Sequence, residues 1–317
     1  MTYIQDLSEG LRLQNTIYLL HKITNGTTKA GKPFLTYELQ DKTGTINAMV
    51  WTPDSPVFHE CAERDYICVS GEVTSFNGRL QMKLESVSVA NEGTYNPADY
   101  LPVSDRDVEE MYGELIRLVE SVKTDYLNTL LESFFKDENF KKSFCFHSAA
   151  KSVHHGFVGG LLEHTLSVAQ ACNFFAKQYP MLDRDLLITA ALCHDIGKTK
   201  EISAFPENDY TDDGQLLGHI VIGYDMLRDR IAEIPNFPEM KARELLHCIL
   251  AHHGELEFGS PKKPALMEAM ALSFADNMDA KMETMKEALK ATAPGNTEWQ
   301  GYNRFLETNI RRTSPEE

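Results

Sequence analysis

The chain has 317 residues, of which 42% are hydrophobic and 25% are charged, and its formal net charge is −16. This composition excludes a disordered or fibrous protein and predicts a globular protein of about two domains. No apolar run approaches the ~20 residues that a membrane-spanning helix needs, so we expect no membrane partner. The net charge also argues against a protein that coats duplex nucleic acid through charge alone.

The six cysteines stand singly along the chain and form no Cys-X-X-Cys pair. This spacing argues against a disulfide framework and against a cysteine-type zinc site, and it is typical of buried cysteines in a reduced cytoplasm. The first residues contain no basic segment followed by an apolar stretch, so no secretory signal is expected. We therefore predict a cytoplasmic protein.

The first part of the chain is rich in β-branched and aromatic residues that alternate with polar ones, as in strands with one solvated face. Turn-like segments separate these runs, and Asn77-Gly78 is the strongest hairpin signal among them. The predicted strands are 13–24, 33–40, 45–51, 65–73 and 80–89, with a segment of helical length at 53–64. Five strands with a helix between the third and the fourth predict an OB-fold, a small closed barrel.

The pattern then changes to a helical period. Residues 93–104 carry two prolines and no periodicity, which is typical of a linker, and Ser104 is expected to cap the first helix. Further helices are predicted at 125–135, 159–178, 183–193, 216–232, 239–251, 264–291 and 299–311. The predicted organisation is a multi-domain protein: an all-β OB-fold barrel over 1–92, a linker over 93–104, an all-α domain over 105–312 and a tail over 313–317.

Histidines and aspartates recur at the predicted helices of the second half. His194-Asp195 ends one apolar helical run and His252-His253 ends another. Imidazole and carboxylate groups together suit divalent ions such as Mn²⁺, Fe²⁺, Zn²⁺ or Mg²⁺. An aspartate beside a histidine can bridge two ions, and two ions can clamp a phosphoryl group. The whole set predicts a metal site, and its members are His164, His194, Asp195, His219, His252, His253 and Asp276.

A single histidine is more often structural than a ligand. We therefore interpret the remaining isolated histidines as structural or surface residues; these are His21, His59, His147 and His247. A lone Asp276 would be a solvated residue of a helix face, but the apolar neighbours Phe274 and Ala275 favour an inward position.

The order of His164, the pair His194-Asp195 and the distant Asp276 resembles the H…HD…D signature of the HD-domain metal phosphohydrolases. The separate His219 and the later pair of histidines resemble the two-metal branch that includes the HD-GYP phosphodiesterases. No Gly-Tyr-Pro tripeptide follows them, which argues against cyclic-dinucleotide hydrolysis. The combination with an OB-fold is similar to the YhaM-type 3′→5′ exoribonucleases, most specifically in the segments SVHHGFVGGLLEHT and ILAHHGELEFGSP.

The resemblance implies two ions, with Mn²⁺ favoured and Co²⁺ as a further alternative. It implies a first ion held by His164, His194, Asp195 and Asp276. It implies a second ion held by Asp195, His219, His252 and His253. Asp195 would then be the central catalytic residue, and Lys198 would face the substrate phosphate. The alternative for Lys198 is a solvated loop lysine.

Three further residues near the motif are candidates with less direct support. His154 and His155 could line the substrate entrance or protonate a leaving oxygen. Asp279 lies three residues after Asp276 on the same helix face, so it is either a support for the metal ligands or an ordinary polar residue.

The predicted barrel contains aromatic residues that could stack on the bases of a single strand. The candidates are Phe34, Tyr37, Trp51 and Phe76, with Lys29, Lys32, Arg79 and Lys83 nearby in sequence. Aromatic residues in strands are more often part of the core, so each candidate also has a structural interpretation.

Three functions remain open at this point. The leading one is a metal-dependent exoribonuclease that acts on single-stranded RNA and releases 5′-mononucleotides, with the 3′→5′ polarity implied only by the resemblance. The second is a phosphodiesterase or phosphatase for small nucleotides, and the third is a non-catalytic single-strand-binding protein. The sequence leaves open the physiological metal, the use of single-stranded DNA and the oligomeric state, including a homo-oligomer.

Overall fold

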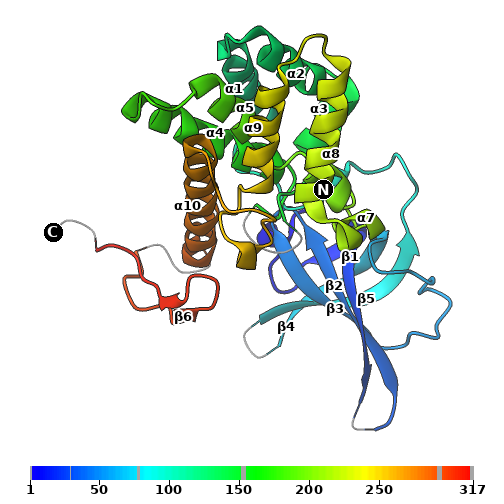
Figure 1. Ribbon diagram of the computed structural model, residues 1–317. Coiled ribbons are helices and arrows are strands. Elements are labelled where there is room, and N and C mark those ends of the chain that lie inside the picture. Colours follow the sequence, from blue (N-terminus) through cyan, green and yellow to red (C-terminus); the bar gives the residue numbers. More distant parts are fainter. Residues whose placement is uncertain (1, 29, 77–78, 151–154, 291–294, 315–317) are drawn as a thin grey trace. The chain divides into compact units, whose positions relative to one another are not determined.

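The computed structural model describes residues 2–28, 30–76, 79–150, 155–290 and 295–314 (Figure 1). The chain divides into two compact units, Met1–Val103 and Ser104–Glu317. The first unit contains a closed barrel, and the second contains all the α-helices of the described residues. The predicted fold class, an all-β barrel followed by a helical domain, is confirmed.

Five strands form the barrel in the order β1-β2-β3-β5-β4. They are β1 Arg12–Thr27, β2 Pro33–Asp41, β3 Gly44–Val50, β4 Tyr66–Phe76 and β5 Arg79–Val89, preceded by the 3₁₀ turn η1 Ile4–Asp6. Neighbouring strands pair antiparallel, except that β3 and β5 pair in parallel and so close the barrel. The expected turn at Asn77-Gly78 lies outside the described residues.

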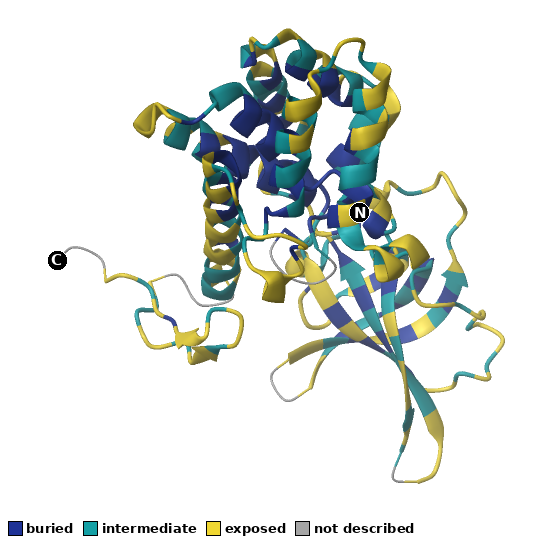
Figure 2. Ribbon diagram, in the orientation of Figure 1, coloured by how far each residue is buried: buried dark blue, intermediate teal, exposed yellow. Residues whose placement is uncertain are grey.

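Buried residues alternate with less buried ones along β3 and β4, as their sequence pattern predicts, and the barrel strands carry both buried and exposed residues (Figure 2). In β4, for example, Ile67, Val69 and Val73 are fully buried. Gly26 and Phe34 pair directly across β1 and β2, and a Cβ on Gly26 would lie 2.3 Å from the Phe34 ring. A side chain at this position would displace the Phe34 ring, so Gly26 allows that ring to lie against the sheet.

The segment between β3 and β4 contains no helix, so the prediction for residues 53–64 is wrong. This segment consists of turns and a single bridge from Phe58 to Val87 of β5. Pro53 and Pro56 explain the difference, because proline lacks the backbone N–H and disfavours the helical conformation of the residue before it.

The helical unit is built from ten helices within its described residues. They are α1 Val108–Ser121, α2 Asp125–Phe135, α3 Glu138–Phe146, α4 Gly160–Gln178, α5 Arg184–Cys193, α6 Lys198–Glu201, α7 Asp212–Leu216, α8 Gly218–Glu233, α9 Glu239–Leu250 and α10 Met267–Lys290. A 3₁₀ turn, η2 Pro97–Asp99, lies in the first unit, and another, η3 Leu256–Phe258, lies in the second.

Aspartates begin several of these helices by accepting hydrogen bonds from backbone N–H groups of the first turn. Asp107 caps α1, and Asp183 caps α5 in the same way. Ser104 is not the cap of the first helix, contrary to the prediction. Its hydroxyl instead donates to Oε2 of Glu163 at 2.5 Å and accepts from the backbone N–H of Arg106.

Helix α5 runs through the centre of the helical core. Every residue from Leu186 to Cys193 is buried, and the helix packs against α1, α2, α4, α9 and α10. A helix that is apolar on all sides is stable only where neighbours surround it. Because α5 ends inside the unit, the two residues that follow it, His194 and Asp195, are also buried.

The C-terminal segment differs from the prediction of a helix over 299–311. It forms a small hairpin of β6 Tyr302–Asn303 and β7 Thr308–Asn309. Asn303 Oδ1 accepts the backbone N–H groups of Phe305 and Leu306, and Glu307 has a left-handed backbone with φ 51°. An asparagine that closes a turn in this way competes with helix formation, which explains the difference.

The six cysteines are free thiols, four of them buried in the helical unit and two half-buried in the barrel unit. Burial raises the pKa of the Cys145 thiol to about 12, so this group is an inert part of the core. Within the described residues, no helix combines the length and the apolar character that crossing a membrane requires.

Candidate metal centre

The candidate site is organised around Asp195, which follows the central helix α5. The turn after it contains Gly197, where a Cβ would lie 2.1 Å from the backbone oxygen of His219. The absence of a side chain at Gly197 therefore allows this turn to pack directly against the first turn of α8. That close approach brings His219 to Asp195.

The Oδ2 atom of Asp195 faces two histidines. It lies 3.4 Å from Nε2 of His164, on α4, and 3.3 Å from Nε2 of His194. Those two nitrogens are 3.2 Å apart, and Oδ1 of Asp276, on α10, lies 3.2 Å from Nε2 of His164. Helices α4, α5 and α10 thus bring three potential ligand groups, His164, His194 and Asp276, to one side of the Asp195 carboxylate.

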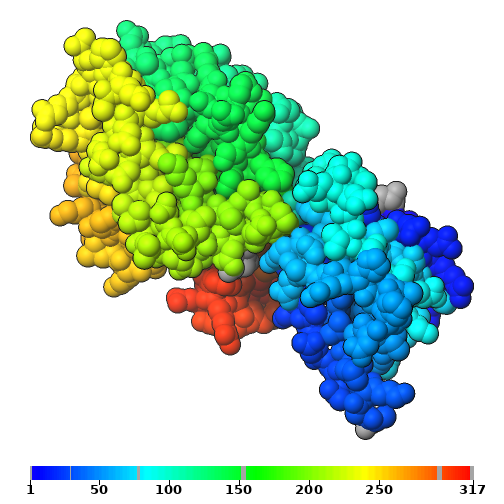
Figure 3. Space-filling model, turned by 90° about the vertical axis from the view of Figure 1, so that its right-hand side faces the viewer, coloured from blue at the N-terminus to red at the C-terminus, as the bar shows by residue number. Residues whose placement is uncertain are grey.

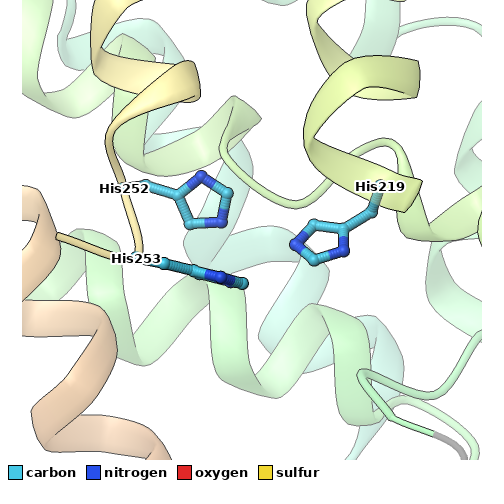
Figure 4. A group of neighbouring side chains, drawn as sticks. All are labelled: His219, His252 and His253. Carbon is cyan, nitrogen blue, oxygen red and sulfur yellow. The ribbon is translucent and has the colours of Figure 1, made fainter. Parts of the chain in front are cut away.

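The Oδ1 atom of Asp195 faces a different pair of histidines. It lies 3.5 Å from Nε2 of His219, at the start of α8, and 3.7 Å from Nε2 of His252, which follows α9. Figure 4 shows the imidazoles of His219, His252 and His253 facing one common space. One ligand nitrogen from each of these three residues lies within 4.8 Å of the others. The two oxygens of one carboxylate are therefore directed toward two separate groups of ligands.

Each of the five histidines is oriented by an acceptor at its Nδ1 atom. His194, His252 and His253 donate from Nδ1 to the backbone oxygens of Ala191, Ile249 and Phe258, at 2.8, 2.6 and 2.7 Å. His164 donates to Asp279 at 2.7 Å, and His219 donates to Glu201 at 3.0 Å. Because carbonyl and carboxylate oxygens only accept, the Nδ1 atom carries the proton and Nε2 faces the site. This arrangement is typical of metal-binding histidines.

Several polar atoms in the site are buried without a hydrogen-bond partner among the described residues. Three of them, Asp195 Oδ1, His219 Nε2 and His252 Nε2, lie together on one side of the Asp195 carboxylate. All three are acceptor atoms, so they cannot satisfy one another, and burying them unpaired is costly. A divalent cation would satisfy them together. The residues therefore fit a metal ion by the chemistry of their donor atoms.

The charges of the site act on the protonation of its groups. Burial alone would raise the pKa of Asp195, but the charges of Lys198 and His194 lower it well below its usual range. Burial and the neighbouring imidazoles lower the pKa of both His252 and His253. These two imidazoles are therefore neutral at pH 7, which is the form that binds a metal.

Lys198 begins α6 and places Nζ 2.7 Å from Oδ2 of Asp195. Burial opposes its charge, but the Asp195 carboxylate outweighs that effect and raises the pKa of Lys198 above its usual value. Lys198 also lines a cavity of about 470 Å³, together with His164, His253 and Asp276. The lysine is thus charged, largely buried and paired with Asp195 on the wall of this cavity, which differs from a solvated loop lysine.

The structure places His155 deeper than the substrate entrance. It is 1% exposed, and its Nε2 lies 2.9 Å from Oδ2 of Asp279, the same oxygen that accepts from Nδ1 of His164. Asp279 thus supports the histidine cluster from α10. His154, the other candidate of this pair, lies outside the described residues.

The barrel candidates separate into exposed and buried rings. Phe76 is 63% exposed and Trp51 is 45% exposed, while Phe34 is half-buried with its ring centre 5.3 Å from that of Trp51. Tyr37 is only 4% exposed and belongs to the barrel core, so its assignment as a base-stacking residue is corrected. A buried ring cannot present its face to a base.

Two descriptions of known protein families match the chain. An OB-fold nucleic acid binding domain matches residues 20–90, and an HD domain matches residues 161–281. The fold and the site therefore define a two-domain protein in which a barrel of the nucleic-acid-binding class precedes an HD domain.

Relatives with known names identify the family. The chain is 36% identical over 280 residues to the 3′-5′ exoribonuclease YhaM of Bacillus subtilis (strain 168), with 88% of each chain covered. It is 34% identical over 284 residues to the protein of the same name from Geobacillus sp. (strain WCH70). The matched region covers 89% of this chain and 87% of the relative. The chain belongs to this YhaM family, a family of hydrolases. The resemblance and the enzyme class predicted from the sequence are confirmed.

Among solved structures, the second OB-fold domain of replication protein A from Methanococcus maripaludis is 17% identical to this chain, with a TM-score of 0.18. It covers 29% of this chain and 96% of that domain. A TM-score this low supports no conclusion about this chain.

Sequence reasoning missed three residues that the structure brings to the site. Glu201 accepts from both Nδ1 and the backbone N–H of His219, at 3.0 and 2.9 Å. Phe258 and Phe305 line the cavity that contains Lys198. Glu201 lies three residues after Lys198 on the same short helix, and this spacing could have marked it as a neighbour of the site. Phe258 lies in the segment ILAHHGELEFGSP that carries the family resemblance, whereas nothing in the local sequence marks Phe305.

Proposed function

We propose that this protein is a metal-dependent 3′→5′ exoribonuclease that shortens single-stranded RNA to 5′-mononucleotides and also accepts single-stranded DNA. Membership of the YhaM family and the presence of an OB-fold nucleic acid binding domain support the substrate class. The observation that carries the proposal is the division of the two Asp195 oxygens between two groups of histidines.

The ligand sets follow from that division. The first ion would be held by His164, His194, Asp195 and Asp276. The second would be held by Asp195, His219, His252 and His253. A set this rich in imidazole favours transition-metal ions such as Mn²⁺, Co²⁺, Fe²⁺ and Zn²⁺ over the harder Ca²⁺ and Mg²⁺, and we propose Mn²⁺ as the ion used. When bound, such ions polarise a phosphoryl oxygen and lower the pKa of water.

The residues around the ions then position the phosphodiester. Lys198 supplies a fixed positive charge at the mouth of the site, where the scissile phosphate enters. Asp279 and Glu201 hold the rings of His164 and His219 so that Nε2 faces inward. Phe34, Trp51 and Phe76 would stack on bases of the strand bound by the barrel, a mode that tolerates any sequence.

The test uses RNA labelled at its 5′ end and purified protein loaded with Mn²⁺. A ladder of progressively shorter labelled products supports the proposal, and a 3′-terminal phosphorothioate linkage should slow the first step. The Asp195→Ala variant is the inactive comparison, and Asp225→Ala, which removes an exposed carboxylate on α8, is the matched control. Release of a labelled mononucleotide before any intermediate would show the opposite polarity. Failure of the wild-type protein to cleave RNA would overturn the proposal.

A further inference from the structure

Two exposed phenylalanines lie on the cavity of the candidate metal centre. Phe258 is 61% exposed and Phe305 is 67% exposed, and both line the cavity of about 470 Å³ that contains His164, Lys198 and Asp276. The volume is in the range of ~300–1,000 Å³ that holds small ligands. Large apolar rings exposed beside a polar site contribute little to folding, so their place calls for a binding role.

Phe258 is held in position by the metal-site residues themselves. It ends the 3₁₀ turn η3, and its backbone oxygen accepts from Nδ1 of His253 at 2.7 Å. Gly259 follows with a left-handed backbone, φ 90°, and ends the turn. The bond that orients His253 therefore also fixes the backbone from which the Phe258 ring projects.

Phe305 comes from the C-terminal hairpin, which forms a small lobe of the helical unit (red in Figure 3). Asn303 Oδ1 accepts the backbone N–H of Phe305 at 2.9 Å and so fixes this residue at the tip between β6 and β7. The hairpin base is closed by a bond of 2.8 Å from Gln300 N to Ile310 O. Arg312 donates to the backbone oxygen of Leu289, which ties the end of the hairpin segment to α10.

We propose that Phe258 and Phe305 form an aromatic clamp for the nucleobase of the nucleotide whose phosphodiester is cleaved. The proposal rests on the proposed function, because it assigns the base position of that substrate. A base held at these rings leaves its phosphate directed to Lys198 and the histidine cluster, which line the same cavity. Lys281, also on this cavity, places a second cation near the backbone of the strand.

The chemistry of the clamp suits an enzyme that removes any nucleotide. Stacking on a phenyl ring uses the flat face of the base, which all four bases possess, so it gives affinity without sequence preference. A base must also leave its neighbours to enter such a clamp, and a base-paired terminus resists this. The clamp therefore predicts a preference for an unpaired 3′ end.

The experiment measures binding and cleavage of a short oligonucleotide by Phe258→Ala and Phe305→Ala. The expected result is a rise of about 5- to 150-fold in KM, and in Kd measured with EDTA present, for each variant. Phe305→Tyr, which keeps the ring, should restore most of the affinity. Tyr302→Ala is the matched control, since Tyr302 is a 64% exposed aromatic residue of the same hairpin that does not line the cavity.

A second substrate separates stacking from a general effect on the fold. An oligonucleotide whose 3′-terminal nucleotide lacks its base should bind the wild-type protein as weakly as the intact oligonucleotide binds Phe305→Ala, and the variant should cause no further loss. Quenching of a 3′-terminal 2-aminopurine on binding to the wild type, absent in the double variant, reports the stacking directly. Equal Kd and KM for wild type and both alanine variants would overturn the clamp. A wild-type protein that quenches 2-aminopurine but cleaves no RNA would instead overturn the proposed function alone.

Discussion

His164 is held between two aspartates of the same helix. Its Nδ1 lies 2.7 Å from Oδ2 of Asp279, and its Nε2 lies 3.2 Å from Oδ1 of Asp276, both on α10. Asp276 and Asp279 are one helical turn apart, so the two carboxylates contact opposite edges of one imidazole. The hydrogen bond to Asp279 fixes the ring, and it leaves Nε2 and the Asp276 oxygen, both acceptors, facing one space where a cation could hold them together.

This arrangement predicts a role for Asp279 that does not require contact with a metal. Asp279→Asn removes the charge that both His155 and His164 contact while keeping the size of the side chain. We expect metal affinity and activity to fall about 10- to 100-fold, with the melting temperature nearly unchanged. Metal titration followed by RNA cleavage tests this, with Asp225→Asn as the control. Affinity within twofold of the wild type would contradict the positioning role.

Glu201 offers the corresponding test on the other side of Asp195. Glu201→Gln weakens the orientation of His219, which binds only in the second group of ligands. We expect the metal-binding event at the second group to lose about 10- to 100-fold in affinity, while the event at the first group stays unchanged. Isothermal titration with Mn²⁺ resolves the two events. An equal loss in both would show that the two ligand groups do not act separately.

Substitutions of the barrel aromatics should affect either RNA binding or stability, depending on whether the ring is exposed or buried. Trp51→Ala and Phe76→Ala should weaken single-strand binding by about 1–3 kcal/mol, because these rings are exposed. Tyr37→Ala should instead lower the free energy of unfolding by about 3–5 kcal/mol, because its ring is in the core. Thermal melting and RNA titration measure the two effects. Normal RNA affinity in both Trp51→Ala and Phe76→Ala would contradict the proposal that these rings stack on bases.

The helical unit has its own core and all seven candidate ligands, so residues 104–317 should fold as an isolated fragment. We expect this fragment to bind Mn²⁺ and to shorten short oligonucleotides, with weaker binding of long RNA than the full chain. Circular dichroism and metal analysis of the fragment test this. A fragment that stays unfolded would show that the helical core needs the barrel.

The sequence predicts most of the fold because local patterns determine it. The alternation in residues 65–73 places Ile67, Val69 and Val73 in the barrel core, as the structure confirms. The prediction fails where a side chain acts on its own backbone, as Asn303 does in the C-terminal hairpin. Helix α3 was also missed, although Asp137 is a cap signal and Phe140 and Phe144 share one face.

The sequence predicts which residues form the site but not how they are arranged. The candidate ligands share a residue type that suits metals, so composition and spacing mark them. The partition of Asp195 Oδ1 and Oδ2 between two groups depends on the packing of α4, α8 and α10 around α5, which no local pattern records. Phe305 reaches the cavity through the same kind of long-range packing, and its isolated position in the sequence gives no signal.

The central claim is that one carboxylate serves two ions, and metal analysis of Asp195→Ala tests it most directly. The wild-type protein should bind two Mn²⁺ per chain and cleave RNA. The variant should lose at least one ion and all measurable cleavage at saturating Mn²⁺, while its circular dichroism spectrum stays that of the wild type. A variant that keeps two ions and near-normal turnover would contradict the shared-carboxylate account.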